Sequence, residues 1–554
     1  MKHSKFLLGV IFAVLVCTIV AQNDVQDGEE EPVTLDADTG TFESFGTVGD
    51  VVTPGSKATD DEVATYGDGY KLTEMVCEGG KCRKASKKDM ESRSKRSTPK
   101  RSATQIKFDT VRRILQTNPD ADMYATLSQE GVPTVVQNSV LLSKWSAFTD
   151  WSFDYFIDLW TPHHAMSPIL VSNSSLPGFK ETIVPFFNFS RDSAWPHVPK
   201  PYYETAMNLG TFFSGQCSKE SPESWWWMKP FPALKDEHVE SDTSYVDFFI
   251  DQSVTNKTTP ILSLVTGSRA ASMQLHYDQD DTFIVQVFRR QQVLLFSPQQ
   301  MRQLYLYPYT HPHRRRSQVM PLTSTTELNW PGIGSIRGIE AMLDAGDVLY
   351  IPRYWGYHVV NLDPGISVHV TSPIVDSRGS DVWSLKNHLI NLEHLDPMKR
   401  VTAAKMALQR VVEPLINEMR EKQKAAQEGS TIDKFAKPQD PSTFDRKVFK
   451  NFLKQHAKQR YGKLPNYKQP GEMTKKEIFQ LVKVHCREAR LPDNKLEPID
   501  NMKLAMRLEG TKEAWSQIPD DDVRMTMLGD WIDFIAWQAY GKHEYAEAFI
   551  RRCF

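Results

Sequence analysis

The chain has 554 residues and a formal net charge of −3. Its length allows more than one domain with a large buried core. The near balance of charge excludes a global electrostatic field directed at nucleic acid or at an anionic membrane. The 13 tryptophans favour a globular protein over a disordered one.

The N-terminal sequence predicts the cellular compartment of the protein. Lys2 and Lys5 precede an apolar run from Phe6 to Ala21, and a polar stretch follows. This layout predicts a secretory signal peptide over residues 1–21. A membrane anchor is the alternative, but the run is short for a bilayer span and acidic residues follow it. We therefore expect a protein of the secretory pathway lumen or the cell exterior, without a membrane span after signal removal.

Residues 22–104 have the composition of a disordered pro-like segment. Residues 22–62 carry 12 acids against one lysine, and from Lys81 to Arg101 ten Lys and Arg face two acids. Such a segment cannot bury enough surface to offset its ordering entropy. "RSKR", ending at Arg96, resembles the cleavage site of furin-type proprotein convertases. A solvated basic linker remains the alternative.

Two further features agree with an oxidising lumen. Asn-x-Ser/Thr triplets begin at Asn173, Asn188 and Asn256 and are candidate glycosylation sites. Disulfides are permitted there, and we expect the pairs Cys77–Cys82 and Cys486–Cys553, although sequence alone does not fix connectivity. A zinc site at "CEGGKC" is the competing interpretation, and it lacks a second ligand pair nearby.

The ordered part begins near residue 106. The spacing of apolar residues predicts a helix over 108–116, and residues 131–145 read as a short strand followed by a helix. Short apolar or alternating runs broken by turn residues then predict many strands, which suggests a double-sheet barrel or sandwich. These runs are 260–265, 283–288, 292–297, 347–352 and 365–372.

Helical periodicity replaces the strand pattern after about residue 378. It covers residues 381–395, 399–427, 476–490 and 523–540. We predict an α+β chain: a barrel domain over 105–377 and a helical region over 378–554. The helical region packs on the barrel or pairs with another subunit, so a homodimer through these helices is possible.

One constellation carries chemistry. His276 and Asp278 stand two residues apart in a strand-like run, so their side chains share one face. His358 lies 80 residues beyond Asp278 and follows a strand and an aromatic turn. Two histidines and one carboxylate form the facial triad of non-haem Fe(II) oxygenases. A structural His-x-Asp pair at a strand end is the alternative.

The surrounding sequence resembles the JmjC (cupin-like) family of Fe(II)- and 2-oxoglutarate-dependent oxygenases, in its small-JmjC hydroxylase branch. The resemblance covers roughly residues 130–375. It lies in "LHYDQDDTFIVQVF", "VLLFSPQQMRQLYLYPYTHPHRRRSQV" and "AMLDAGDVLYIPRYWGYHVVNL". It implies a double-stranded β-helix (jelly-roll) barrel. It also implies Fe(II) on His276, Asp278 and His358, with 2-oxoglutarate as co-substrate.

The sequence departs from the family at the co-substrate positions. Gln291 stands where the family lysine binds the distal carboxylate, so a charge-assisted bond is lost. Thr282 and Thr371 replace asparagines, and Met273 replaces a threonine. Arg289 shares a face with Gln291 by parity and is a candidate for the missing cation, although a solvated turn arginine is the commoner case.

We assign no catalytic or metal-binding role to His369 or to the histidines of residues 310–316. His369 is taken as a core or surface histidine. Residues 310–316, "THPHRRR", are taken as a solvated loop in the insert that lies near the substrate mouth in relatives.

Two functions follow from these observations. The first is an Fe(II)/2-oxoglutarate-dependent protein hydroxylase acting on a protein or peptide of the secretory pathway, with no nucleic-acid partner. The second is a cupin-fold binding or scaffold protein that has lost 2-oxoglutarate turnover. Gln291, Thr282 and Thr371 favour the second, and the three expected metal ligands favour the first.

Overall fold

The structure is a computed structural model. It describes residues 75–78, 81–84, 106–118, 122–162, 165–172, 182–183, 202–217, 225–234, 236–243, 246–250, 259–319, 330–372, 382, 384–427, 445–464 and 472–554. The chain forms two compact units, Met1–Thr98 and Pro99–Phe554. The predicted signal peptide, the convertase site and the three glycosylation triplets lie outside the described residues.

The described part of the first unit is a hairpin of β1 (Met75–Glu78) and β2 (Lys81–Lys84). Its register places Cys77 opposite Cys82. The proposed disulfide between these two cysteines stays a prediction.

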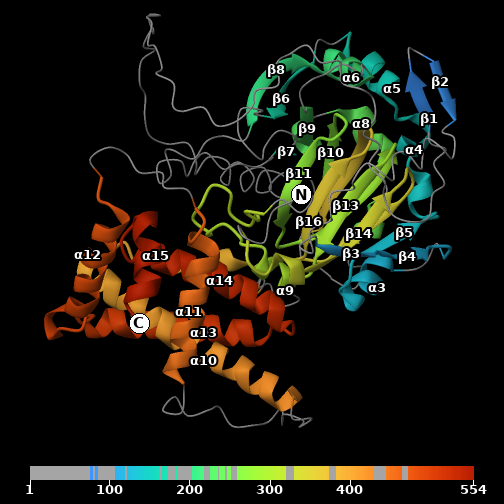
Figure 1. Cartoon of the computed structure of the whole chain (residues 1–554). Coiled ribbons are helices and arrows are strands. Elements are labelled where there is room, and N and C mark those ends of the chain that lie inside the picture. Colours follow the sequence, from blue (N-terminus) through green and yellow to red (C-terminus); the bar gives the residue numbers. More distant parts are fainter. Residues whose placement is uncertain are drawn as a thin grey trace, which may run out of the picture. The chain divides into compact units, whose positions relative to one another are not determined.

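Two sheets form the barrel of the second unit (Figure 1). The nine-stranded sheet has the order β4 (Arg112–Leu115), β5 (Thr134–Gln137), β15 (Val348–Ile351), β12 (Asp281–Phe288), β17 (Gly365–Ser372), β10 (Ile261–Gly267), β9 (Trp225–Pro230), β6 (Met166–Ser172) and β8 (Tyr202–Asn208). The six-stranded sheet has the order β3 (Lys107–Thr110), β14 (Arg337–Leu343), β13 (Gln291–Phe296), β16 (Gly356–Asn361), β11 (Ser272–Tyr277) and β7 (Thr182–Ile183).

The barrel core lies between these two sheets. Val265, Ile284 and Leu349 of the larger sheet pack in one cluster with Val293 and Val359 of the smaller one. Strand residues alternate between faces, so side chains two residues apart, such as Val293 and Leu295 of β13, point into this core. The predicted jelly-roll fold of α+β class is confirmed.

The outer face of the larger sheet is covered by short helices from the N-terminal half of the unit. Phe156, Phe213 and Trp227 lie in the aromatic cluster that fills this layer. The helices are α3 (Met123–Glu130), α4 (Ala147–Asp150), α5 (Phe153–Trp160), α6 (Leu209–Cys217), α7 (Phe231–Leu234) and α8 (Glu237–Asp242).

The C-terminal helices, orange to red in Figure 1, form a bundle. They are α10 (Pro397–Gln427), α11 (Arg446–Tyr461), α12 (Lys475–Glu488), α13 (Pro498–Ser516), α14 (Asp521–Gln538) and α15 (His543–Arg552). Thr474 and Glu477 form a capping box that begins α12. The predicted disulfide Cys486–Cys553 is confirmed, and it ties α12 to the residue after α15.

The bundle and the barrel share one hydrophobic cluster. Leu275 and Leu294, on the outer face of the smaller sheet, pack in it together with α10 and α14 residues such as Leu408 and Trp531. Helix α9 (Pro298–Gln303), in the barrel insert, contacts α14. The helical region therefore packs on the barrel, which is one of the two arrangements that the sequence predicted. Pairing with another subunit stays a prediction.

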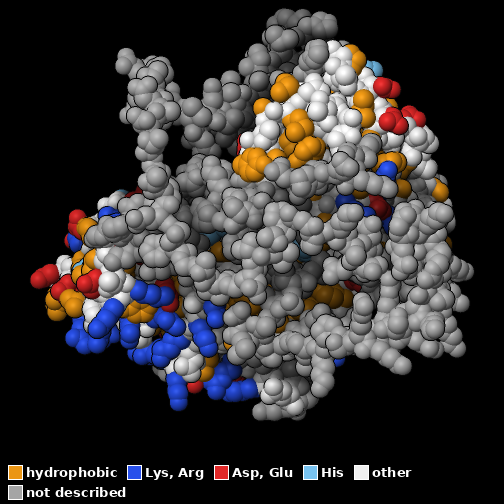
Figure 2. Space-filling view, turned by 45° about the horizontal axis from the view of Figure 1, so that its top comes forward, with side chains coloured by type: hydrophobic (Ala, Val, Ile, Leu, Met, Phe, Trp, Pro, Cys, Tyr) orange, Lys and Arg blue, Asp and Glu red, His pale blue; other side chains and the backbone are white. Residues whose placement is uncertain are grey.

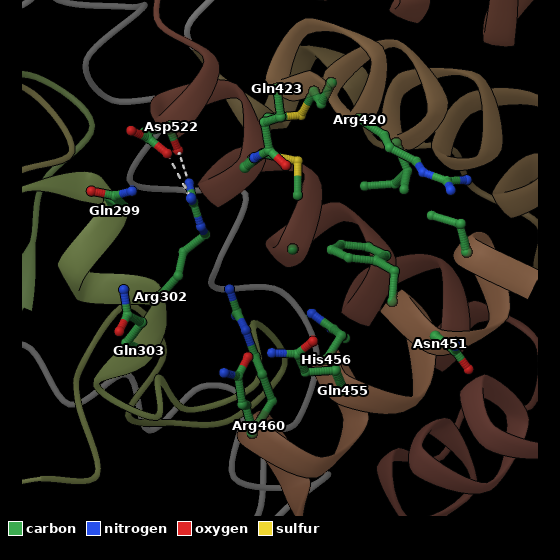
Figure 3. A pocket seen from close by; sticks show the side chains of 17 residues that line it. Gln299, Arg302, Gln303, Arg420, Gln423, Asn451, Gln455, His456, Arg460 and Asp522 are labelled. Carbon is green, nitrogen blue, oxygen red and sulfur yellow. Dashed lines mark hydrogen bonds and ion pairs between the residues drawn. The ribbon is translucent and has the colours of Figure 1, made fainter. Parts of the chain in front are cut away.

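A buried charge network fixes this junction. The Arg460 guanidinium lies 2.6 Å from Asp530 Oδ1 and 3.0 Å from Asp533 Oδ2. On the barrel side, the hydroxyl of Tyr277 donates to Asp530, and the backbone N–H of Tyr309 donates to Asp533 at 3.1 Å. A cleft of about 640 Å³ opens above Arg460, between α9, α10, α11 and α14 (Figure 3).

Three local predictions are wrong. The helix expected after the strand in residues 131–145 is the 3-10 turn Leu142–Lys144. Residues 108–116 form β3 and β4 rather than a helix, because pairing with β14 and β5 overrides the local spacing. Residues 385–388 form a single 3-10 turn where a longer helix was predicted over 381–395. The strands predicted within 260–372 and the helices predicted over 399–427, 476–490 and 523–540 are confirmed. Among the described helices, none is both long and apolar enough to cross a membrane.

Candidate functional site

His276 and Asp278 lie together at the end of β11, as their spacing predicts. The His276 Nε2 atom is 3.8 Å from Asp278 Oδ2, and Nδ1 is 2.8 Å from the Gln274 carbonyl oxygen. Burial lowers the pKa of His276 to about 4, so the imidazole is neutral at pH 7. The pKa of Asp278 lies below its usual value despite burial, because His276 and Arg315 favour the carboxylate.

Tyr357 is the third side chain that lies beside His276 and Asp278. It pairs with His276 across β11 and β16, and the two ring centroids are 4.2 Å apart. Its hydroxyl donates to Asp278 Oδ2 at 2.5 Å. Burial, followed by the Asp278 charge, raises the pKa of this phenol well above its usual value. Tyr357 therefore stays protonated.

His358 faces away from Asp278, which corrects the expected ligand set. Its cross-strand partner Leu294 belongs to the hydrophobic cluster between the smaller sheet and the C-terminal helices. Tyr357 and Val359, by contrast, belong to the barrel core. Gly356 lies on the same outer face as His358. A Cβ atom at Gly356 would meet Met301 Sδ at 2.0 Å, so close packing fixes this face of β16. Strand alternation then turns His358 outward.

Arg315 places a positive charge beside Asp278. Its Nη1 atom is 3.7 Å from Asp278 Oδ1, and each side chain is about one-third exposed, at 32 % and 31 %. The insert that carries Arg315 pairs with β11 through Tyr277 N to Arg315 O at 3.2 Å and Ser317 N to Leu275 O at 2.9 Å. The guanidinium thus neutralises the carboxylate from within the chain.

The insert is not the solvated loop that was predicted. His311 and His313 are buried, and their stacked rings lie 5.4 Å apart. Burial lowers the pKa of both imidazoles well below the usual value. The stretch is therefore packed structure that carries Arg315 to the site.

Gln291 lies inside the barrel at the start of β13. Its Nε2 atom donates to Asn361 Oδ1 at 2.8 Å and lies 3.4 Å from Ser367 Oγ. The amide is thus held by neighbouring strands, and it supplies no positive charge.

Arg289 does not supply the missing cation, which corrects that expectation. It is exposed and has a left-handed φ of 62° in the turn between β12 and β13. Its guanidinium lies over the rings of Phe153 and Phe288, at 5.8 and 5.2 Å from the centroids. The turn breaks the strand alternation on which the shared face with Gln291 depended.

The other expected co-substrate residues lie in neighbouring strands. Thr282 of β12 pairs with Thr371 of β17, and neither side chain brings a charge. His369, two residues before Thr371, is buried, and its pKa is lowered to about 3, first by burial and then by the His276 charge. Its burial shows that, of the two predicted alternatives, His369 is a core histidine and not a surface one.

The residues present do not fit an iron facial triad. Among the residues that the structure describes, no three His, Cys, Asp or Glu side chains converge closely enough to hold a metal ion. The donor set at the expected place is one imidazole, one carboxylate that an arginine already neutralises, and one protonated phenol. Iron sites of this class need a second imidazole in the place of that phenol.

Comparison with known proteins places this barrel in a family. Residues 120–371 match the cupin-like domain family, and this part of the chain is a cupin-like domain. The human "tRNA wybutosine-synthesizing protein 5" is 31 % identical over 146 residues, which is 26 % of this chain and 40 % of that protein.

Two further relatives also match part of the chain. The Danio rerio "tRNA wybutosine-synthesizing protein 5" is 28 % identical over 188 residues, 34 % of this chain and 52 % of that protein. A Dictyostelium discoideum "JmjC domain-containing protein D" is 27 % identical over 107 residues, 18 % of this chain and 22 % of that protein. The chain thus spans about half or less of the length of these relatives.

Two residues of the site were missed by sequence reasoning. Tyr357 stands next to the only histidine of "RYWGYH", and the choice between the two positions depends on which face of β16 each one takes. Gly356 was the available signal, because it marks the tightly packed outer face. Arg315 had no local signal, since its place depends on how the insert folds back on β11.

Proposed function

We propose that the cupin-like domain is a binding domain that does not turn over 2-oxoglutarate. The observation that carries this proposal is the position of Tyr357. A protonated phenol that donates to Asp278 holds the place where a histidine would have to bind iron. Since the phenolic proton and the Arg315 cation already satisfy the carboxylate, this chain supplies for itself the charge balance that a metal would provide.

The co-substrate positions support the same proposal. A family-type 2-oxoglutarate site needs a cation for the distal carboxylate, and Gln291 is a neutral amide already bonded to Asn361. Arg289, the candidate replacement, stacks on two phenyl rings outside the barrel.

Polar atoms inside the barrel suit a small polar ligand. The buried atoms Nε2 of His369 and Oε1 of Gln291 have no hydrogen-bond partner among the residues that the structure describes. An unpartnered buried polar atom costs roughly 1–3 kcal/mol. Ser367 links the two, because it precedes His369 by two residues on the same face and lies next to Gln291. A neutral ligand with both a donor and an acceptor would satisfy these atoms.

The competing interpretation is a 2-oxoglutarate-dependent protein hydroxylase of the secretory pathway. It rests on His276, Asp278 and the family of the barrel. A protein or peptide partner, a lumenal or extracellular location and a homodimer through the helical region stay predictions under either interpretation.

Isothermal titration of 2-oxoglutarate into the full chain in the presence of Mn²⁺, a redox-inert stand-in for Fe(II), tests the proposal. We expect no saturable heat up to millimolar ligand, and no succinate release above background in a parallel turnover assay with Fe(II). Saturable binding together with succinate release that Asp278→Ala abolishes would establish the hydroxylase instead.

A further inference from the structure

Helix α11 carries positive charge without any acid. Its exposed residues include Arg446, Lys447, Lys450, Lys454 and Lys458, and the helix contains no Asp or Glu. None of the four lysines forms an ion pair or a side-chain hydrogen bond within the described structure. This helix therefore presents its positive charge to the surroundings.

The spacing of these lysines does not favour helix stability. Lys450, Lys454 and Lys458 follow one another at intervals of four residues, so they form a row about 6 Å apart on one face. Like charges at this spacing destabilise a helix by roughly 0.2–0.5 kcal/mol per pair. A ligand of opposite charge would reverse the sign of that contribution.

The row borders a hollow that is lined by cations. The hollow has a volume of about 590 Å³, and its lining has no carboxylate. It is lined by Lys454, Gln455, Lys458, Phe479, Arg551 and Arg552. Figure 2 shows Lys and Arg side chains gathered over the C-terminal helical region. Lys476 and Lys483 extend the charge on α12, since they stand three before and four after Phe479.

The arginines of the hollow are held in place before any ligand arrives. The Arg552 guanidinium lies over the Phe479 ring at 5.3 Å from its centroid. Arg551 bonds to Glu547 at 3.1 Å, and Glu547 is largely buried beneath the surface. The disulfide Cys486–Cys553 fixes the residue that follows Arg552. Groups that are already ordered lose little entropy on binding.

We propose that α11, α12 and α15 form a binding surface for a sulfated glycosaminoglycan, with a sulfated sugar unit in the hollow beside Phe479. Repeated sulfate groups along an extended chain match a row of exposed lysines that ends at a cationic hollow. Nucleic acid shares the negative charge, but the buried disulfide that joins α12 to the residue after α15 indicates an oxidising compartment, where sulfated glycans are the abundant polyanions. This inference goes beyond the barrel and does not depend on its function.

The test measures binding of a heparin oligosaccharide of defined length to the full chain by isothermal titration at several salt concentrations. The variant K454Q/K458Q removes two charges from the surface. The matched control K495Q/K503Q removes two exposed lysines at and near α13. We expect the first variant to bind about tenfold more weakly, and the control to bind within about twofold of the native chain.

The salt dependence gives a second readout. The slope of log affinity against log salt should fall by roughly one per removed contact in K454Q/K458Q and stay unchanged in the control. Equal heparin affinity of both variants would overturn the proposal. Tighter binding of a single-stranded RNA of equal charge, lost in K454Q/K458Q, would assign the surface to nucleic acid instead. Unchanged thermal unfolding of the variants establishes that the fold is intact.

Discussion

Tyr357 donates its hydroxyl hydrogen to Asp278 at 2.5 Å, at the position where an iron facial triad would need a second imidazole. A neutral phenol and a carboxylate bond tightly without a metal, because the proton takes the place of the cation. Arg315 adds a second internal charge at 3.7 Å. The site is therefore complete as a hydrogen-bonded cluster.

Tyr357→His is expected to create a metal site. The new imidazole would stand beside His276 and Asp278 on the inner face of the barrel, which gives the donor set of a facial triad. We expect Mn²⁺ affinity, measured by titration calorimetry, to rise by at least about tenfold over the native chain. His358→Ala in the Tyr357→His background is the matched control and should leave the Mn²⁺ affinity of that variant unchanged, since His358 faces outward. A drop in affinity with His358→Ala would contradict the geometry described.

Gln291→Leu is expected to lower stability without changing the shape of the barrel. The substitution keeps the volume, but it leaves Oδ1 of Asn361 without the donor that now lies 2.8 Å away. A buried polar atom that loses its partner costs roughly 1–3 kcal/mol in the free energy of unfolding, and removal of the unpartnered Oε1 atom of Gln291 offsets part of this cost. Urea unfolding at pH 7 measures this loss. A variant as stable as the native chain would mean that water reaches Asn361.

Asp533→Asn is expected to weaken the junction between the barrel and the helices. Asp533 is fully buried and accepts from Arg460, Tyr461 and the Tyr309 N–H. Removing one partner of a buried charge pair typically costs about 3–5 kcal/mol. Asp522→Asn is the control, because Asp522 pairs with Arg302 at the half-exposed rim of the cleft in Figure 3 and should cost less than about 1 kcal/mol.

The same carboxylate predicts a pH dependence. Burial raises the pKa of Asp533, but Arg460 and His456 outweigh it, so the folded-state pKa lies below the usual value. A carboxyl group whose pKa is lower in the folded state stabilises the fold at pH values above its unfolded-state pKa of about 3.9. This contribution is lost as the pH falls through the folded-state pKa. The stability gap between the native chain and Asp533→Asn should therefore be constant from pH 7 to about 5 and shrink below about pH 4. A gap that persists unchanged at pH 3 would show that the charge of Asp533 does not matter.

The sequence predicted the barrel better than the site. Alternating strand runs such as 283–288 and the long helical period of 399–427 carry their own pattern, so these elements could be read locally. His276 and Asp278 share a face by spacing alone. The position of His358 depends on the face that β16 turns to the core, and that face is set by packing of Gly356 against Met301. The strands β3 and β4 likewise depend on distant partners, which no local spacing reveals.

Removal of the disulfide is expected to destabilise the helical region. The Cys486–Cys553 bond closes a loop with a sequence separation of 67 residues. Restricting the unfolded chain over such a loop contributes about 4 kcal/mol in the chain-entropy description. The double variant Cys486→Ser/Cys553→Ser should lose stability of this order in urea unfolding, and a reducing agent should lower the native chain to the same level while leaving the variant unchanged. If reduction leaves the native chain as stable as before, the bond does not hold α12 and α15 together.

Heparin affinity should fall in parallel with the loss of the bond, because Arg551 and Arg552 directly precede Cys553.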